Sequence, residues 1–209
     1  MKVLLVNGSA KASGCTNRAL CEVAGELEKA GIEYEIIHLG PAPIRDCTEC
    51  QNCLKTKSGR CVFDDDIVNV FIEKARQADA FVYGSPVYYA HPSGRILALL
   101  DRAYYAGRDA FEHKPAAAVV SARRGGTTAA IDVLNKYITY ADSPLVSSSY
   151  WNMVHGNTPS EVEQDTEGLQ TMRNLGRNMA WLLKCIDLGK KNGVDAPERE
   201  KGKWTNFIR

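Results

Sequence analysis

Four of the seven cysteines of the chain lie in one short segment, CTECQNCLKTKSGRC, at positions 47–61. Three of them follow one another at two-residue gaps, and a fourth comes after seven intervening residues: Cys47, Cys50, Cys53 and Cys61. Cysteine thiolates are ligands of zinc and of iron–sulfur clusters. Equal two-residue gaps allow one tight loop to reach three corners of a [4Fe–4S] cubane, and Cys61 completes the set of four metal ligands.

Two other interpretations of the cysteine segment remain open. Structural zinc sites usually divide their ligands into two short Cys pairs that lie a dozen or more residues apart, which is not the spacing here. The thiols can also stay unmetallated in a loop or an interface. The spacing favours the cluster over unmetallated thiols and places zinc last.

Basic side chains flank the cysteine segment. They are Arg45, Lys55, Lys57 and Arg60. Positive charge near an iron–sulfur cluster raises its reduction potential relative to a neutral environment, so these residues are the first candidates for tuning a cluster at this place. Simple solvation at the surface is the alternative.

The composition bounds the class of protein. With 209 residues, the chain is near the upper end for one compact domain. Its 26 Lys and Arg residues balance 25 Asp and Glu residues, so no net charge attracts nucleic acid or an anionic membrane. The first apolar run is too short for a signal-peptide core, and no window approaches the ~20 apolar residues of a membrane span. We therefore expect a cytoplasmic protein, where clustered cysteines indicate metal or redox chemistry.

The elements that position such chemistry follow from the alternation of apolar runs and amphipathic patterns. Strands are predicted at 2–7, 33–39, 79–85, 115–122 and 144–150, and helices at 16–31, 64–78, 93–106, 126–141 and about 160–190. This alternation predicts an α/β three-layer sandwich with a five-stranded parallel sheet, and right-handed crossovers favour the strand order 2-1-3-4-5. We expect one domain over 1–190, a cysteine-rich insertion at 45–63, and a tail at 191–209 that crosses the surface.

The loop after the first strand predicts an anion site. Ligands of open parallel sheets bind beyond the carboxyl ends of the strands. There, Gly8 permits a sharp exit, and a starting helix offers free N–H groups beside Ser9, Ser13, Thr16 and Asn17. The loop lacks the Lys of a triphosphate loop and the G-x-G-x-x-G of a dinucleotide site. A single phosphate monoester, such as that of FMN, suits it.

Two further loops should lie at the same edge of the sheet. After the third strand, GSPVYY combines a stiff turn with apolar and aromatic surface on which a flavin ring can stack. After the fourth strand, Gly125 and Gly126 permit close approach of the backbone to a ring, and Arg123 and Arg124 can face the electron-rich end of a flavin or a nicotinamide phosphate. Core tyrosines and solvated arginines are the alternatives.

With these motifs, the chain resembles the NAD(P)H-dependent FMN reductase group of the flavodoxin-like superfamily, and more narrowly the iron–sulfur flavoproteins. GSAKASGCTN is similar to the phosphate loop of that group, and GSPVYY to its flavin loop. The four cysteines followed by Asp65 and Asp66 resemble its C-x2-C-x2-C…C-V-x-x-D-D pattern. The resemblance implies a flavodoxin-like fold, tightly bound FMN, and a homodimer or homotetramer in which one subunit covers its neighbour's flavin.

The resemblance, together with the loops above, also assigns binding positions. Those expected to bind FMN are Ser9, Lys11, Ser13, Cys15, Thr16, Asn17, Ser85, Pro86, Val87, Tyr88, Tyr89, Arg123, Gly125 and Gly126. The metal ligands would be the four cysteines of the 47–61 segment. That segment is expected on the same sheet edge as the flavin loops, and the pKa of Cys15, at a helix start, is expected to be lowered.

The expected function is that of an FMN-dependent oxidoreductase. It would take electrons from NAD(P)H or a ferredoxin-like donor and pass them to a small-molecule or protein acceptor, with a [4Fe–4S] cluster as an optional relay. The flavin carries the chemistry, so no side chain is predicted to be catalytic. A cluster-free quinone, azo or nitro reductase is one alternative. A non-enzymatic flavodoxin-like carrier is the other, and the neutral net charge and the arginine-bearing loop argue against it.

Overall fold

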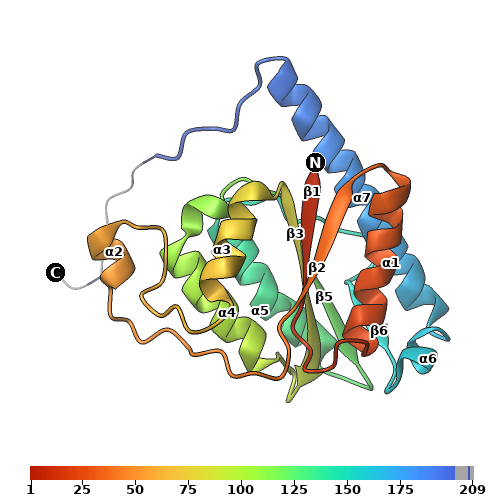
Figure 1. Ribbon diagram of the computed structural model, residues 1–209. Helices are drawn as coiled ribbons and strands as arrows, with labels where there is room; N and C mark the ends of the chain where they lie inside the picture. The colour runs from red at the N-terminus through yellow and green to blue at the C-terminus, as the bar shows by residue number, and fades with distance from the viewer. Residues whose placement is uncertain (201–206, 208–209) are drawn as a thin grey trace.

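A parallel β-sheet forms the middle layer of the protein, seen in a computed structural model that describes residues 1–200 and 207 (Figure 1). Its strands are β1 (Lys2–Asn7), β2 (Glu33–His38), β3 (Ala80–Tyr88), β5 (Ala116–Ala122) and β6 (Met153–His155). They lie in the order β2-β1-β3-β5-β6, and a short β4 (His91–Pro92) pairs antiparallel with the end of β3. The predicted α/β class and strand order are confirmed.

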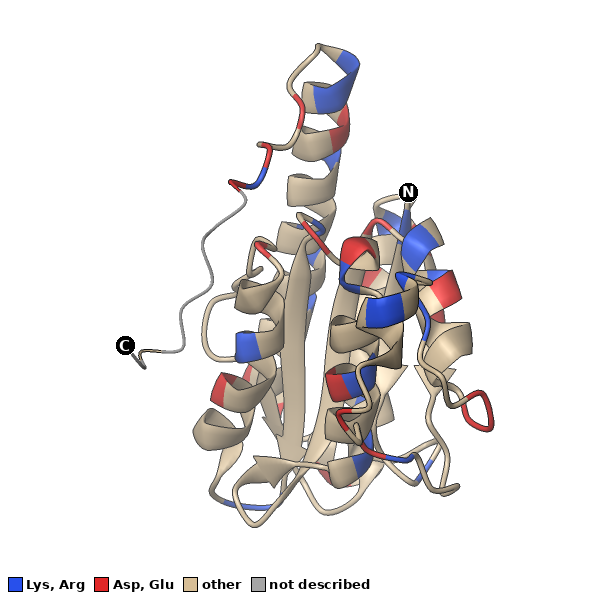
Figure 2. Ribbon diagram, turned by 90° about the vertical axis from the view of Figure 1, so that its left-hand side faces the viewer, with Lys and Arg blue, Asp and Glu red and all other residues tan. Residues whose placement is uncertain are grey.

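Helices cover both faces of the sheet (Figure 1). One face carries α3 (Val68–Gln77), α4 (Gly94–Ala106) and α5 (Thr127–Tyr140), and the other carries α1 (Cys15–Lys29) and α7 (Thr166–Lys191). Three short helical segments lie in the connections: α2 (Asn52–Thr56), η1 (Arg108–Ala110) and α6 (Pro159–Val162). Figure 2 shows basic and acidic residues interspersed on the visible surface, as the balanced composition predicts.

The last strand lies later in the chain than expected. The predicted strand at 144–150 is wrong, because Leu145 forms only an isolated bridge with Ala116, and the ladder with β5 continues at β6. Between them, the Ser148 hydroxyl hydrogen-bonds the carbonyl of Tyr150 at 2.7 Å. Serine side chains that bond the local main chain compete with strand pairing, so this serine-rich stretch leaves the sheet.

Side-chain caps set where the two C-terminal helices, α6 and α7, begin. Asp165 accepts the N–H of Gly168 and caps α7, so the predicted helix at about 160–190 is divided into α6 and α7. After α7 the chain turns back, and Arg199 lies 3.6 Å from Glu112 and 3.5 Å from Asp142. Trp204 and Ile208 of the predicted tail lie outside the described residues. No helix within residues 1–200 combines the length and apolarity needed to cross a membrane.

Helices α1 and α7 approach each other closely at Gly176. A Cβ atom there would lie 2.8 Å from both the Val23 carbonyl oxygen and the Glu26 Cβ, closer than such atoms can pack. Beside this contact, the buried Glu26 carboxylate accepts hydrogen bonds from Lys29 and Arg177, which lower its pKa. A glycine in α7 is therefore required by packing and not by backbone conformation.

A matched pair of glycine substitutions tests this contact. Gly176→Ala should lower the free energy of unfolding by about 1–3 kcal/mol, because overpacking forces the two helices apart. Gly25→Ala, in α1, meets nothing within 4 Å in the described part of the chain and should raise it by up to ~1 kcal/mol through helix propensity. Urea denaturation midpoints measure both, and equal midpoints for the two variants would contradict the packing account.

Candidate flavin and cluster sites

The loop between β1 and α1 is fixed to the middle of the sheet. The N–H of Gly8 donates to the carbonyl of Gly84 at 2.8 Å, and the Ser93 hydroxyl donates to the carbonyl of Gly8 at 2.7 Å. A Cβ on Gly8 would lie 2.9 Å from Gly84 O and 2.9 Å from Ile96 Cβ. Only glycine fits here, so the chain leaves β1 in direct contact with β3 and with the first turn of α4.

The same loop surrounds a helix N-terminus with free donors. Within the described residues no side chain caps α1, whose N-cap is Gly14, and its first turn carries no acidic residue. Asn7 Oδ1 accepts the N–H of Ser9 at 3.1 Å, and Ser9 Oγ accepts the N–H of Lys11 at 3.1 Å, so the loop is shaped by its own polar groups. Free N–H groups and the positive end of the helix dipole make this position suited to an anion.

The structure distributes the predicted phosphate-loop residues between surface and interior. Lys11 and Ser13 are exposed at the loop, whereas the hydroxyl of buried Thr16 bonds that of Ser121 on β5 at 2.8 Å. Thr16 thus offers its backbone N–H at the start of α1. Cys15 donates its thiol to the carbonyl of Gly156 at 3.6 Å. The expectation of a lowered pKa for Cys15 is wrong: burial disfavours the thiolate and raises the pKa.

The second and third predicted flavin loops touch each other. Strand β3 continues to Tyr88, turns at Tyr89 and Ala90, which both have positive φ, and returns as β4. Gly126 has a φ of 97°, and a Cβ there would lie 2.8 Å from Ala90 Cα. The turn after β5 therefore packs against the tip of this hairpin. Arg123, which follows β5, is exposed beside this turn.

Several contacts at this edge were not predicted from the sequence. His38 Nε2 lies 2.9 Å from the carbonyl of Ser9, and Ser85 Oγ accepts the N–H of Ser93 at 2.9 Å. Ser121 holds Thr16, as described above. These contacts join residues far apart in the chain, and only the position of His38 at the end of the second predicted strand could have indicated one of them.

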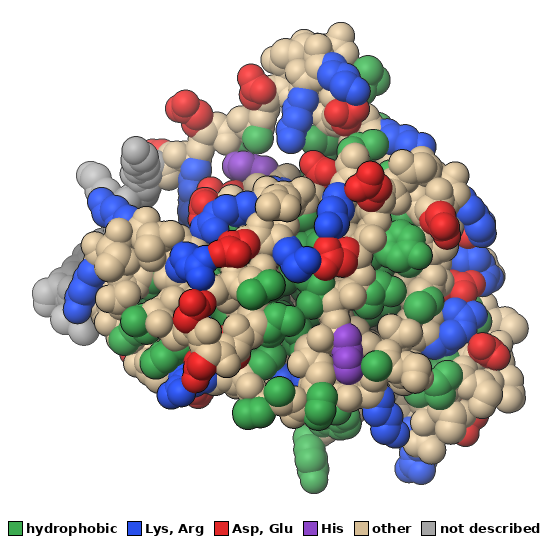
Figure 3. All heavy atoms as spheres, viewed as in Figure 1, with side chains coloured by type: hydrophobic (Ala, Val, Ile, Leu, Met, Phe, Trp, Pro, Cys, Tyr) green, Lys and Arg blue, Asp and Glu red, His purple; other side chains and the backbone are tan. Residues whose placement is uncertain are grey.

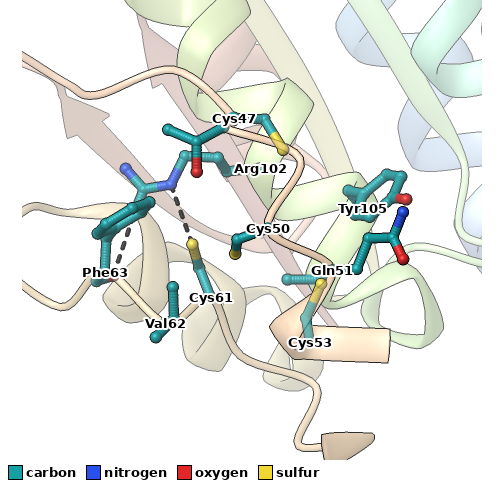
Figure 4. A pocket seen from close by; sticks show the side chains of 11 residues that line it. Cys47, Cys50, Gln51, Cys53, Cys61, Val62, Phe63, Arg102 and Tyr105 are labelled. Atoms are coloured by element: carbon teal, nitrogen blue, oxygen red, sulfur yellow. Dashed lines mark hydrogen bonds between the residues drawn. The ribbon is translucent and has the colours of Figure 1, made fainter. Parts of the chain in front are cut away.

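The four cysteines of the 47–61 segment line one hollow, shown in Figure 4. The other lining side chains include Val62, Phe63, Arg102, Tyr105 and Ala106. Burial, the neighbouring Cys61 and the neighbouring Cys50 raise the pKa of Cys53. Among the described residues, no three His, Cys, Asp or Glu side chains converge on a point that could hold a single metal ion. In a [4Fe–4S] site each thiolate binds its own iron, so four cysteines around a shared hollow fit such a cluster.

The cysteine hollow lies away from the flavin loops, so the expectation of a shared sheet edge is wrong. Its walls include Arg102, Tyr105 and Ala106 from the last part of α4, whereas Ser93 before α4 contacts the phosphate loop. From Gly94 to Tyr105 a helix rises by about 16 Å. The segment after β2 runs up the outside of α3 and α4 instead of staying at the edge (Figure 1).

Arg102 connects the cysteine segment to α4. Its side chain is 1% exposed and forms an ion pair with Asp66. Nε donates to Cys61 Sγ at 3.2 Å, Nη1 to the carbonyl of Arg45 at 3.0 Å, and Nη2 to the carbonyl of Phe63 at 3.0 Å. Burial alone would lower the pKa of Arg102, but the hydrogen bonds to Asp66 and Cys61 outweigh it and raise the pKa. The guanidinium is therefore firmly charged.

The fold defines a protein of the flavodoxin-like class, and three loops meet at the carboxyl edge of its sheet around a helix N-terminus suited to an anion. The chain belongs to the NADPH-dependent FMN reductase family, whose model matches residues 1–158. It is an oxidoreductase of that family, and membership supports FMN as its cofactor.

Individual relatives extend this similarity over most of the chain. An iron–sulfur flavoprotein of Methanocaldococcus jannaschii is 29% identical, covering 89% of this chain and 99% of the relative. One of Archaeoglobus fulgidus is 34% identical, covering 72% of this chain and 78% of the relative. Among solved structures, an NAD(P)H:quinone oxidoreductase from Methanothermobacter marburgensis has a TM-score of 0.64 at 19% identity, covering 86% of this chain and 98% of that chain. The latter comparison shows the fold.

A charge introduced at the phosphate loop tests the anion site. Ser13→Glu should weaken FMN binding at least about tenfold, ~1.4 kcal/mol, and leave riboflavin binding unchanged, because only FMN carries the phosphate. An acidic residue at a helix N-terminus favours the helix, so the fold should be retained. Quenching of flavin fluorescence measures both affinities. Ser13→Ala serves as the uncharged control, and an equal loss for both flavins in Ser13→Glu would contradict the assignment.

Proposed function

We propose that the protein transfers electrons from a reduced nicotinamide to an acceptor through FMN bound at the carboxyl edge of the sheet. The observation that carries this proposal is the contact among the three loops around the N-terminus of α1, which no side chain of the described residues caps. Membership of the FMN reductase family supports both the flavin and the nicotinamide. NADH and NADPH are both compatible donors, as is a ferredoxin-like protein.

The chain's own residues would bind and orient the cofactor. The free N–H groups of α1 and the hydroxyls of Ser9 and Ser13 would hold the phosphate, and the Gly125–Gly126 turn would let main chain approach the ring. The Tyr88–Tyr89 hairpin would flank it. FMN, when bound, supplies hydride and single-electron chemistry, so the protein's role is binding, orientation and control of access.

We further propose that the four cysteines of the 47–61 segment hold a [4Fe–4S] cluster that relays single electrons. Their placement around one hollow supports this, as does similarity to relatives named iron–sulfur flavoproteins. The acceptor beyond it would be a small molecule or a protein.

We also propose that the protein works as a homodimer or homotetramer. Tyr88 is 55% exposed and Tyr89 fully exposed, although both belong to the hairpin assigned to the flavin ring. Figure 3 shows hydrophobic side chains along the lower rim of the molecule, where the parallel strands end. A neighbouring copy that covers this rim would shield the flavin from water.

A cluster-free reductase of quinones, azo compounds or nitro compounds is the second candidate. Cys47 and Cys50 are exposed, and the raised pKa of Cys53 favours a protonated thiol at neutral pH. Similarity in fold to a quinone oxidoreductase agrees with this candidate.

Anaerobic purification followed by two assays tests the proposal. We expect the visible absorption band of bound FMN, bleaching of that band by NADH or NADPH, and iron with acid-labile sulfide in equal amounts. Flavin without iron or sulfide would select the cluster-free candidate. Protein that shows no flavin band even after addition of FMN would contradict the proposed function altogether.

A further inference from the structure

The most buried charged side chain among the described residues lies against the cysteine segment. Arg102 is 1% exposed, and the side chain of its partner Asp66 is 7% exposed. Arginine and aspartate are almost never fully buried unless they are paired. A buried ion pair adds little to stability compared with a well-packed apolar pair. Its presence beside four cysteines therefore points to a role other than packing.

We propose that Arg102 is a positioning residue of the cysteine hollow, which holds Cys61 in place and raises the reduction potential of a [4Fe–4S] cluster bound there. This inference rests on the cluster included in the proposed function. Neither the flavin site nor the nicotinamide reaction depends on it.

The holding role follows from the geometry of the guanidinium. Its N–H groups form a planar fork, which can bind several acceptors in fixed directions. In this protein the fork reaches Arg45 before the first cysteine, Cys61 itself, and Phe63 and Asp66 after it. Both ends of the cysteine segment are thereby joined to one side chain of α4. A lysine has no such fork and could bond only part of this set.

The electrostatic role follows from burial and from the direction of the Nε–H bond. Reduction adds one negative charge to a cluster, and hydrogen bonds to its sulfurs are among the factors that set its potential. The guanidinium donates to Cys61 Sγ at 3.2 Å from a site that water does not reach. A charge in such a place acts more strongly than a charge screened by solvent. The carboxylate of Asp66 offsets part of the effect, so the two residues act on the potential in opposite directions.

The exposed cations near the segment provide a matched control. Arg45 carries the same charge as Arg102 and lies just before the cysteine segment, and its guanidinium carbon lies 4.5 Å from the centre of the Phe63 ring. Its side chain is 50% exposed and pairs with exposed Asp65. Its carbonyl, not its side chain, binds Arg102. Replacement of the Arg45 side chain removes a positive charge without disturbing that bond.

The experiment compares Arg102→Gln, Arg102→Lys, Asp66→Asn and Arg45→Gln with the wild type as full-length, anaerobically purified proteins. Iron and acid-labile sulfide give the cluster content, and titration with dithionite followed by electron paramagnetic resonance gives the midpoint potential. Hydrogen exchange of segment 45–66 in iron-free protein gives an independent measure of the holding role.

Opposite shifts are the expected result. Arg102→Gln should lower the equilibrium constant for one-electron reduction at least about tenfold, ~59 mV, and Asp66→Asn should raise the potential. Arg45→Gln should shift the potential much less than Arg102→Gln. Arg102→Lys should retain part of the rise in reduction potential, because it keeps the positive charge. It should lose the protection of the segment against hydrogen exchange. Opposite signs at two partners of one ion pair are not expected from a purely structural role.

Several results would overturn the inference and remain distinct from failure of the proposed function. Equal potentials in wild type and Arg102→Gln, or equal shifts in Arg102→Gln and Arg45→Gln, would refute it while leaving the cluster in place. Wild-type protein without iron would refute both the cluster and this inference, while reduction of FMN by nicotinamide would still test the flavin site. If Arg102→Gln does not fold, the shifts in midpoint potential of Arg102→Lys and Asp66→Asn test the inference, and a lower potential in Asp66→Asn would refute it.

Discussion

The packing of α4 against the sheet is the constraint on which both sites depend. Ile96, Leu99, Leu100 and Ala103 are completely buried on one side of the helix, and burial of each larger side chain contributes roughly 1.5–3 kcal/mol. The start of α4 is bonded through Ser93 to the phosphate loop and the flavin hairpin, and its end carries the arginine that holds the cysteine segment. A single rigid helix therefore fixes the flavin loops at one end and the cysteine hollow at the other. A change in its packing would disturb both.

Close backbone contacts hold the three loops in place at the carboxyl edge of the sheet. The buried ion pair holds the cysteine segment in place in the same way. Gly8 and Gly126 each lie where a Cβ would collide with a neighbouring loop or helix, so the three loops fit together only with glycine at these positions. The result is a group of loops around the start of α1, which no side chain among the described residues caps. At the cysteine hollow, four side-chain bonds from Arg102 replace the regular secondary structure that the segment lacks apart from α2. Both arrangements prepare binding groups before a cofactor arrives, which reduces the entropy lost on binding.

Local patterns in the sequence predicted most of the fold and the meeting of the three loops at the carboxyl edge of the sheet. Strand order and the three loops were accessible because apolar runs, glycine turns and right-handed crossovers are properties of short segments or of general topology. The strand at 144–150 failed because the Ser148 hydroxyl bonds the nearby main chain of Tyr150, a choice that only the folded structure reveals. The prediction that the cysteines lie at the sheet edge was wrong for a similar reason. Arg102 holds the segment against the last part of α4, away from the sheet edge, and nothing in the sequence distinguishes this arginine from other charges in a helix.

The central claim is that the flavin and the cysteine thiols occupy separate sites joined by α4. The most direct test is to replace all four cysteines of the segment, Cys47, Cys50, Cys53 and Cys61, with serine and to measure FMN affinity and iron content in the same preparation. Cys21→Ser, at an exposed cysteine of α1, is the control and should change neither. The account predicts that the fourfold variant binds FMN as the wild type does and contains no iron. Loss of FMN binding in a variant that remains folded would contradict it, since the cysteines would then belong to the flavin site.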